Sequence, residues 1–169
     1  MAEKSKTCCF TGHRPDKLPW GADESTPGTI SLKNRIFDAV RSAYDEGFRH
    51  FICGMATGCD MYFCEAVLTL KFTEPSVTLE AAIPFEGQAE GWSEGNRRRY
   101  YSLLRQCDSA CVMGTSYSRG CFTKRNRYMV DCSGRLIAAF SGSPGGTEKT
   151  IAYAEKHGVQ VIMLPVIPS

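Results

Sequence analysis

Short apolar segments alternate with longer amphipathic segments along this chain of 169 residues. Six apolar, β-prone runs are predicted to be strands: residues 7–11, 50–53, 77–83, 109–113, 136–140 and 159–164. Several of them are almost continuously apolar, which is typical of strands that are covered on both faces. The pattern therefore predicts a mostly parallel sheet of about six strands.

The segments between these runs have the spacing of helices. Ser31 is expected to cap a helix that carries Leu32, Ile36, Val40 and Ala43 on one face and ends at Gly47. Further helices are predicted from Asp60 to about Lys71 and over residues 122–132. Another begins near Ser93, with residues 97–99 largely outside, and the last runs from a capping Thr147 to just before Gly158. Such alternation implies right-handed crossovers and one three-layer α/β domain over residues 1–169.

Net charge and the length of the apolar runs bear on whether the protein binds nucleic acid or a membrane. The net charge of +2 is too small to imply binding to nucleic acid or to a membrane, so nucleic acid is the least expected partner. No apolar run is long enough to span a bilayer, and residues 1–6 lack the apolar core of a secretory signal. We therefore expect a cytoplasmic protein with no membrane partner, and the sequence is compatible with a homo-oligomer.

Nine cysteines are many for this length, but none forms a C-x-x-C pair. An odd number without an export signal favours reduced, buried thiols over disulfides. Cys8, Cys9 and His13 are the one candidate set of metal ligands, but no further residues complete it. We therefore expect no metal site.

Glycine-rich segments follow four of the predicted strands. In parallel sheets, ligands bind beyond the carboxyl ends of the strands, so the residues that follow the strands are the candidate ligand-binding residues. They are Thr11, Gly12, His13 and Arg14 after the first strand, Gly54, Met55, Ala56, Gly58 and Asp60 after the second, Pro84, Phe85, Gln88 and Trp92 after the third, and Gly145, Gly146 and Thr147 after the fifth.

The last of these segments gives the strongest local signal. Successive glycines and a threonine before a helix expose free N–H groups at the positive end of the helix dipole, which favours a phosphate. Arg125 shares a helix face with Met129, so Arg125 and its neighbour Asn126 are expected beside the same site. The spacing matches neither G-x-G-x-x-G nor a P-loop, and Lys149 follows Glu148 rather than glycine, which argues against an ATP-hydrolysing P-loop.

Two of the candidate residues have alternative interpretations. Asp60 either complements a helix dipole or accepts hydrogen bonds from ribose hydroxyls. Trp92 either stacks on a base or, as is commoner for a tryptophan in a loop, packs on the core.

Taken together, these segments resemble the YpsA-like proteins of the SLOG superfamily. The resemblance is carried, in chain order, by residues 11–15, 54–60 with Glu65, 83–92, 125–131 and 145–147, and it covers nearly the whole chain. It implies a Rossmann-like fold that binds a nucleotide-derived ligand, such as an ADP-ribose derivative or a nucleoside monophosphate. The superfamily also includes the DNA-processing protein DprA and the LOG enzymes, which are nucleoside-monophosphate phosphoribohydrolases.

The sequence departs from the LOG pattern at two positions. Asn126 stands where the LOG helix has lysine, and Thr150 stands where the LOG loop has its catalytic glutamate. Cleavage of an N-glycosidic bond needs a well-placed carboxylate, and only Asp60 and Glu65 remain as catalytic candidates. We therefore expect a protein that senses, carries or sequesters its ligand. The alternatives are a nucleotide N-glycosidase and an interaction protein with a vestigial site.

Overall fold

The computed structural model describes residues 2–168, along which six strands alternate with five α-helices. The strands are β1 (Thr7–Gly12), β2 (His50–Cys53), β3 (Thr78–Ile83), β4 (Ser109–Val112), β5 (Arg135–Phe140) and β6 (Gln160–Pro165). The helices are α1 (Pro27–Asp45), α2 (Cys59–Thr73), α3 (Glu94–Gln106), α4 (Cys121–Asp131) and α5 (Gly146–Lys156), with 3₁₀ turns at Lys4–Lys6 and Pro15–Lys17. Every strand lies within one residue of its predicted bounds. Within this part of the chain, no helix is both long and apolar enough to cross a membrane.

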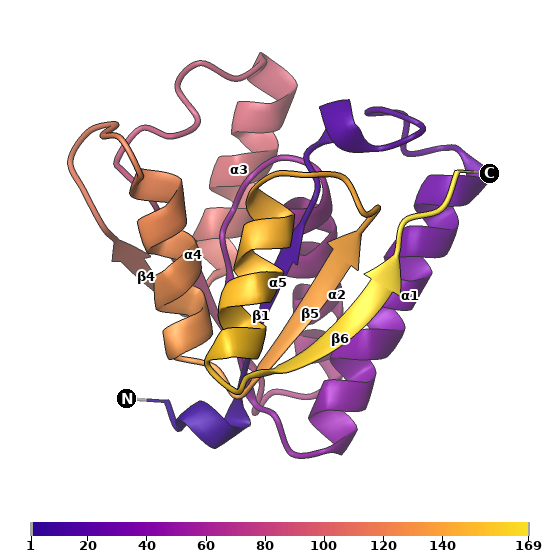
Figure 1. Ribbon diagram of the computed structural model, residues 1–169, viewed down its shortest axis with the longest axis vertical. Helices are drawn as coiled ribbons and strands as arrows, with labels where there is room; N and C mark the ends of the chain where they lie inside the picture. The colour runs from indigo at the N-terminus through magenta and orange to yellow at the C-terminus, as the bar shows by residue number, and fades with distance from the viewer. Residues whose placement is uncertain (1, 169) are drawn as a thin grey trace.

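The strands form one sheet in the order β4-β3-β2-β1-β5-β6, and every neighbouring pair is parallel (Figure 1). From β1 the chain moves strand by strand to the β4 edge and then returns to the other side of β1 to form β5. The strand order therefore reverses between β1 and β5. In open α/β sheets, this reversal opens a crevice beyond the carboxyl ends of the two strands.

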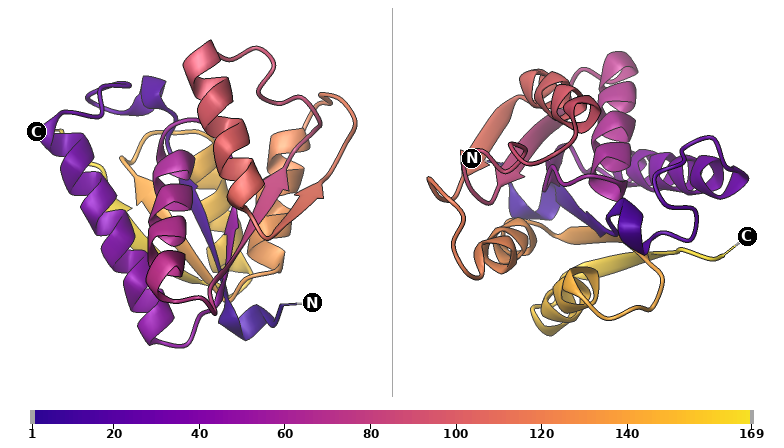
Figure 2. Two further views of the ribbon diagram at one scale, coloured as in Figure 1. Left: turned by 180° about the vertical axis from the view of Figure 1, so that it is seen from behind. Right: turned by 90° about the horizontal axis from the view of Figure 1, so that it is seen from above.

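Helices cover both faces of the sheet, as the two views of Figure 2 show. Helices α1, α2 and α3 lie on one face, and α4 and α5 lie on the other. Along β1, Cys8 and Phe10 belong to the core under α1–α3, whereas Cys9 between them belongs to the core under α4 and α5. Both faces of β1 are thus buried, which explains its continuous apolar sequence and confirms the predicted three-layer α/β fold.

Helix α1 begins before the predicted cap. The side chain of Thr26 accepts a hydrogen bond from the backbone N–H of Thr29 at 3.2 Å, and Pro27 occupies the first helical position. Proline suits that position because its ring presets φ and its missing N–H would have had no partner there. The prediction of Ser31 as the cap is wrong, since Ser31 lies inside the helix.

Helix α5 also starts without the predicted threonine cap. Gly145 precedes the helix with φ of 148° and offers no side-chain cap, and Thr147 is already the second helical residue. The first N–H groups of a helix have no partner within it. At the start of α5 no side chain accepts a hydrogen bond from these N–H groups, because the cap residue is Gly145.

The core beneath α2 contains a stacked aromatic pair. Phe63 is fully buried and stacks on Phe10 with ring centroids 4.8 Å apart. Phe72, nine residues further along the same helix, is 91% exposed. The same substitution at these two positions therefore separates core packing from helix propensity.

We predict that Phe63→Ala lowers the free energy of unfolding by about 3–5 kcal/mol, because it removes buried surface and leaves a cavity. Phe72→Ala should change that free energy by no more than about 0.5 kcal/mol. Urea unfolding followed by circular dichroism measures both values. A Phe63→Ala variant as stable as Phe72→Ala would contradict the packing described here.

Candidate functional site

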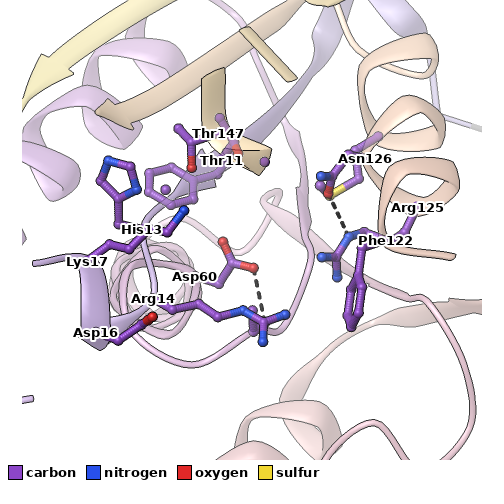
Figure 3. A pocket seen from close by; sticks show the side chains of 15 residues that line it. Thr11, His13, Arg14, Asp16, Lys17, Asp60, Phe122, Arg125, Asn126 and Thr147 are labelled. Carbon is purple, nitrogen blue, oxygen red and sulfur yellow. Dashed lines mark hydrogen bonds between the residues drawn. The ribbon is translucent and has the colours of Figure 1, made fainter. Parts of the chain in front are cut away.

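A cavity of about 180 Å³ lies at the carboxyl ends of the strands, at the point where the strand order reverses (Figure 3). Its walls come from the segment after β1, the segment around the start of α2, helix α4 and the first turn of α5. The lining residues are Phe10, Thr11, Gly12, His13, Arg14, Asp16, Lys17, Ala56, Asp60, Phe122, Arg125, Asn126, Met129, Gly146 and Thr147. Segments that are far apart in the sequence thus meet at one basic hollow.

Arg125 of α4 forms the floor of this cavity. It is only 5% exposed, and its Nη1 group donates to the backbone carbonyls of Gly54 and, at 3.5 Å, Ala82. Its Nε donates to Oδ1 of Asn126 at 2.8 Å. Within residues 2–168, these hydrogen bonds involve Nε and Nη1, and the two N–H groups of Nη2 have no partner. Burial lowers the pKa of Arg125, and the nearby carboxylate of Asp60 opposes that shift.

Asp60 lies opposite Arg125 at the start of α2. Its Oδ2 accepts a hydrogen bond from the backbone N–H of Ala56 at 3.0 Å. Burial raises the pKa of Asp60, while Arg125 and the Ala56 N–H partly offset this effect. Gly54 permits the close approach of the two charged groups, because a Cβ at this position would lie 2.9 Å from both the guanidinium carbon of Arg125 and Oδ2 of Asp60.

Lys17 joins the segment after β1 to the start of α5. Its ammonium group donates to the carbonyl of Pro144 at 3.2 Å and lies beside Gly145. A Cβ on Gly145 would come within 2.5 Å of that nitrogen, and φ of 148° already disfavours a side chain there. The glycine thus lets a lysine ammonium group pack against the uncapped end of the helix.

His13 makes a second link between the same two segments. The backbone N–H of Ser141 donates to Nε2 of His13 at 3.0 Å, and the Ser141 hydroxyl lies 2.9 Å from the same nitrogen. Because the backbone N–H can only donate, Nε2 carries no proton and the ring is neutral. Burial lowers the pKa of His13, Lys17 lowers it further, and Asp16 opposes the shift.

The structure brings ten of the predicted ligand-binding residues to the cavity wall. They are Thr11, Gly12, His13, Arg14, Ala56, Asp60, Arg125, Asn126, Gly146 and Thr147. The other eight, which do not line it, are Gly54, Met55, Gly58, Pro84, Phe85, Gln88, Trp92 and Gly145. Most of these eight support the wall from behind.

Their contacts describe that support. Met55 adopts φ of 60°, an uncommon value for a residue other than glycine, and its carbonyl accepts from Nε2 of Gln88 at 3.5 Å. Phe85 packs edge-on against Phe122 of the wall, with centroids 6.1 Å apart. Trp92 packs edge-on against Tyr100 of α3, with centroids 5.3 Å apart, which agrees with the packing interpretation of this tryptophan.

Glu65 does not reach the cavity. It forms a two-point ion pair with Arg99 of α3 at 2.6 and 3.0 Å, and Glu24 pairs with the same guanidinium. Arg99 is accordingly half-buried, so the expectation that residues 97–99 lie largely outside holds only for Arg97 and Arg98. Of the two catalytic candidates, Asp60 alone lines the cavity.

The cysteines lie apart from this chemistry. All nine are free thiols, and burial raises the pKa of Cys9 to about 12. Cys8 and Cys9 point to opposite faces of the sheet, so they do not converge with His13. Within residues 2–168, no three His, Cys, Asp or Glu side chains form a group that would hold a metal ion.

Five residues of the wall were not among the predicted ligand-binding residues: Phe10, Asp16, Lys17, Phe122 and Met129. Lys17 lies in the loop after β1, where a single lysine carries no distinguishing pattern. Phe122 lies between two guanidinium groups, with the guanidinium carbons of Arg14 and Arg125 at 5.1 and 5.8 Å from its ring centroid. Its position one turn before Arg125 on the same helix was a usable signal.

The doubly wound sheet and the basic cavity at its switch point define a Rossmann-like α/β protein. The family model YpsA, described as the YspA SLOG family, matches residues 8–165, and the chain belongs to this family. It is 29% identical over 143 residues to the uncharacterized SPbeta prophage-derived protein YoqJ of Bacillus subtilis (strain 168), covering 77% of this chain and 84% of that protein. It is 26% identical over 153 residues to a UPF0398 protein of Bacillus thuringiensis (strain Al Hakam), covering 89% and 83%.

Solved structures of similar fold include DNA processing protein A (DprA) from Streptococcus pneumoniae, with a TM-score of 0.64 and 19% identity. DprA from Helicobacter pylori, with a TM-score of 0.63 and 18% identity, is described with a unique single-stranded DNA binding mode. This chain is covered to 96% in both comparisons but spans only 51% and 66% of those proteins. At such low identity the likeness establishes the fold.

The expectation that nucleic acid is the least expected partner is overturned by this likeness to a DNA-binding protein. The expectation rested on the net charge of +2, which averages over the whole surface. Local charge decides such binding instead, and here Arg14, Lys17 and Arg125 gather at one cavity.

We predict that His13 makes the folded state less stable as the pH falls below about 6.5, the ordinary pKa of histidine. In that range the unfolded chain binds a proton that the folded chain, with its lowered His13 pKa, does not bind. His13→Gln keeps an acceptor for the Ser141 N–H but does not titrate, so it should lose part of the decrease in urea midpoint between pH 7.5 and 5.5. His157→Gln, at the exposed C-cap residue of α5, is the control for a histidine-to-glutamine exchange away from the cavity. Identical pH dependence in all three proteins would contradict the prediction.

Proposed function

We propose that this protein binds a phosphate-bearing, nucleotide-derived ligand in the cavity at the switch point. The observation that carries the proposal is the buried guanidinium of Arg125, whose Nη2 group has no hydrogen-bond partner among the described residues and lies at the cavity floor. Nη2 is not among the buried side-chain atoms without a partner in the described residues, so its N–H groups reach the open cavity, where they can donate to a bound anion. A phosphate supplies acceptor oxygens for both N–H groups.

The start of α5 supports the same assignment independently of Arg125. Gly146 and Thr147 line the cavity, and no side chain caps the N–H groups of this first turn. The helix dipole adds a partial positive charge at this end. Lys17, held beside Gly145, adds a full charge.

The size of the cavity indicates how much of a ligand it encloses. Its volume of about 180 Å³ is smaller than the roughly 300–1,000 Å³ of pockets for drug-sized ligands. A phosphate with part of its sugar matches this space, and the base would then extend beyond it. We therefore assign the cavity to the phosphate end of the ligand.

Single-stranded DNA is a second candidate ligand, because its phosphates offer the same chemistry. The likeness to H. pylori DprA, which is described with a single-stranded DNA binding mode, favours it. A free nucleotide and a DNA strand differ in how binding depends on salt, since a strand releases several counterions when it binds. A free nucleotide and an oligonucleotide are therefore both needed as probes.

We predict that Gly146→Val lowers the affinity for AMP and for a 5′-phosphorylated thymidine oligonucleotide by at least about tenfold. A Cβ on Gly146 meets no atom within 4 Å, so the valine enters open space at the cavity wall and does not strain the fold. Isothermal titration calorimetry measures the affinities, and urea unfolding checks the fold. Gly91→Val, also at an open and exposed glycine but outside the cavity, is the matched control. Wild-type affinity for both probes in a folded Gly146→Val protein would sink the assignment.

Binding without cleavage is the second part of the proposal. Asp60 is the one candidate carboxylate at the cavity floor, and its Oδ2 already accepts the Ala56 N–H. Thr150, at the position of the LOG glutamate, donates its hydroxyl to the carbonyl of Gly146 at 2.8 Å. A threonine hydroxyl is a poor general base, and this one is directed at the backbone.

We predict that the protein releases no free base from nucleoside monophosphates or ADP-ribose over many hours. Chromatography of the incubated mixtures detects the base. Asp60→Asn removes the one catalytic candidate that lines the cavity and serves as the matched comparison. Release over multiple turnovers by the wild type, lost in Asp60→Asn, would make the N-glycosidase alternative correct.

A further inference from the structure

A second hollow of about 170 Å³ lies between α4 and α5, next to the first. It is lined by Thr123, Asn126 and Arg127 of α4 and by Gly146, Lys149, Thr150 and Tyr153 of α5. Each set spans about one or two turns, with members three or four residues apart (Thr123 with Asn126 and Arg127, and Gly146 with Lys149 and Thr150), so one face of each helix lines the hollow.

The two hollows share a wall. Asn126 and Gly146 line both of them. Gly146 has no side chain, and a Cβ there would meet no atom within 4 Å, so on the α5 side the division between the hollows is bare backbone. Figure 3 shows Asn126 and Thr147 on facing sides of the first cavity. A ligand seated in the first cavity can therefore extend over Gly146 into the second.

The charges of the second hollow differ from those of the first. Lys149 and Arg127 bring two cations, and none of the seven lining residues is acidic. In the first cavity Asp16 and Asp60 offset part of the positive charge. Arg127 also lies over the ring of Tyr153, 5.1 Å from its centroid. The hydroxyl of Tyr153 donates to Oδ1 of Asp131 at 2.8 Å, so one carboxylate lies just outside the lining. The second hollow thus favours an anionic group even more clearly than the first.

We propose that the second hollow is a subsite for a second phosphate of the same ligand, with Lys149 and Arg127 as its cationic contacts. The inference rests on the proposed function of the first cavity. The site then selects ligands with two linked phosphate groups over nucleoside monophosphates. Two kinds of molecule have this chemistry: a nucleoside diphosphate, and the 5′ end of a phosphorylated DNA strand.

Calorimetric titration with AMP and ADP tests the subsite. The wild type should bind ADP about tenfold more tightly than AMP, the usual scale of one charge-assisted contact. Lys149→Ala should bring the two affinities to within about twofold of each other and leave the AMP affinity unchanged. Lys156→Ala, which removes an exposed lysine from the last turn of the same helix, should keep the tenfold preference.

The outcomes separate this inference from the proposed function. AMP binding with no advantage for ADP would overturn the subsite and leave the proposed function standing, as would an equal loss for both nucleotides in Lys149→Ala. Binding of neither nucleotide, nor of 5′-phosphorylated thymidine dinucleotide, would overturn both. Tighter binding of the dinucleotide than of ADP, lost in Lys149→Ala, would support the subsite and assign it to a DNA strand. The reverse order would assign it to a small diphosphate.

Discussion

The buried guanidinium of Arg125 is the interaction on which the site depends. It connects α4 to the backbone beyond β2, through the carbonyl of Gly54, and to β3, through the carbonyl of Ala82. A full positive charge at 5% exposure is tolerated only because carbonyl dipoles and the nearby Asp60 compensate it. That arrangement requires glycine at position 54, since any side chain there would overlap with both charged groups.

The remaining walls of the cavity follow from the topology. Because β1 and β5 are neighbours that send their helices to opposite faces, the segments that follow them separate and leave a crevice. Two contacts connect these segments across the crevice, from Lys17 to Pro144 and from His13 to Ser141. The uncapped start of α5 is thereby held in place as a set of donors.

The position of the carboxylates around the cavity bears on the choice between binding and cleavage. LOG-type cleavage requires a carboxylate on the last helix, but Thr150 directs its hydroxyl at a backbone carbonyl. Glu65 is held by Arg99 at a distance from the cavity, in an ion-pair cluster that also fastens Glu24 of the loop before α1. The positions that line the cavity are therefore rich in cations and donors and poor in free bases.

The sequence alone determined the sheet, because strands buried on both faces must be apolar along their whole length, and this signal is local. It also identified most of the cavity wall, since glycines before a helix and residues after a parallel strand have predictable places in such folds. Only the tertiary structure decided which of these segments face the cavity. Glu65 pairs with Arg99 and Lys17 with Pro144, each a partner far away in the sequence, and Trp92 packs on Tyr100 of the following helix. The start of α1 at Thr26 rather than Ser31 shows the same limit within a single element, since Thr26 and Pro27 satisfied the helix end five residues earlier than the apolar spacing indicated. Periodicity records which side of an element is buried, whereas the direction of a polar side chain depends on partners that only the folded chain brings within reach.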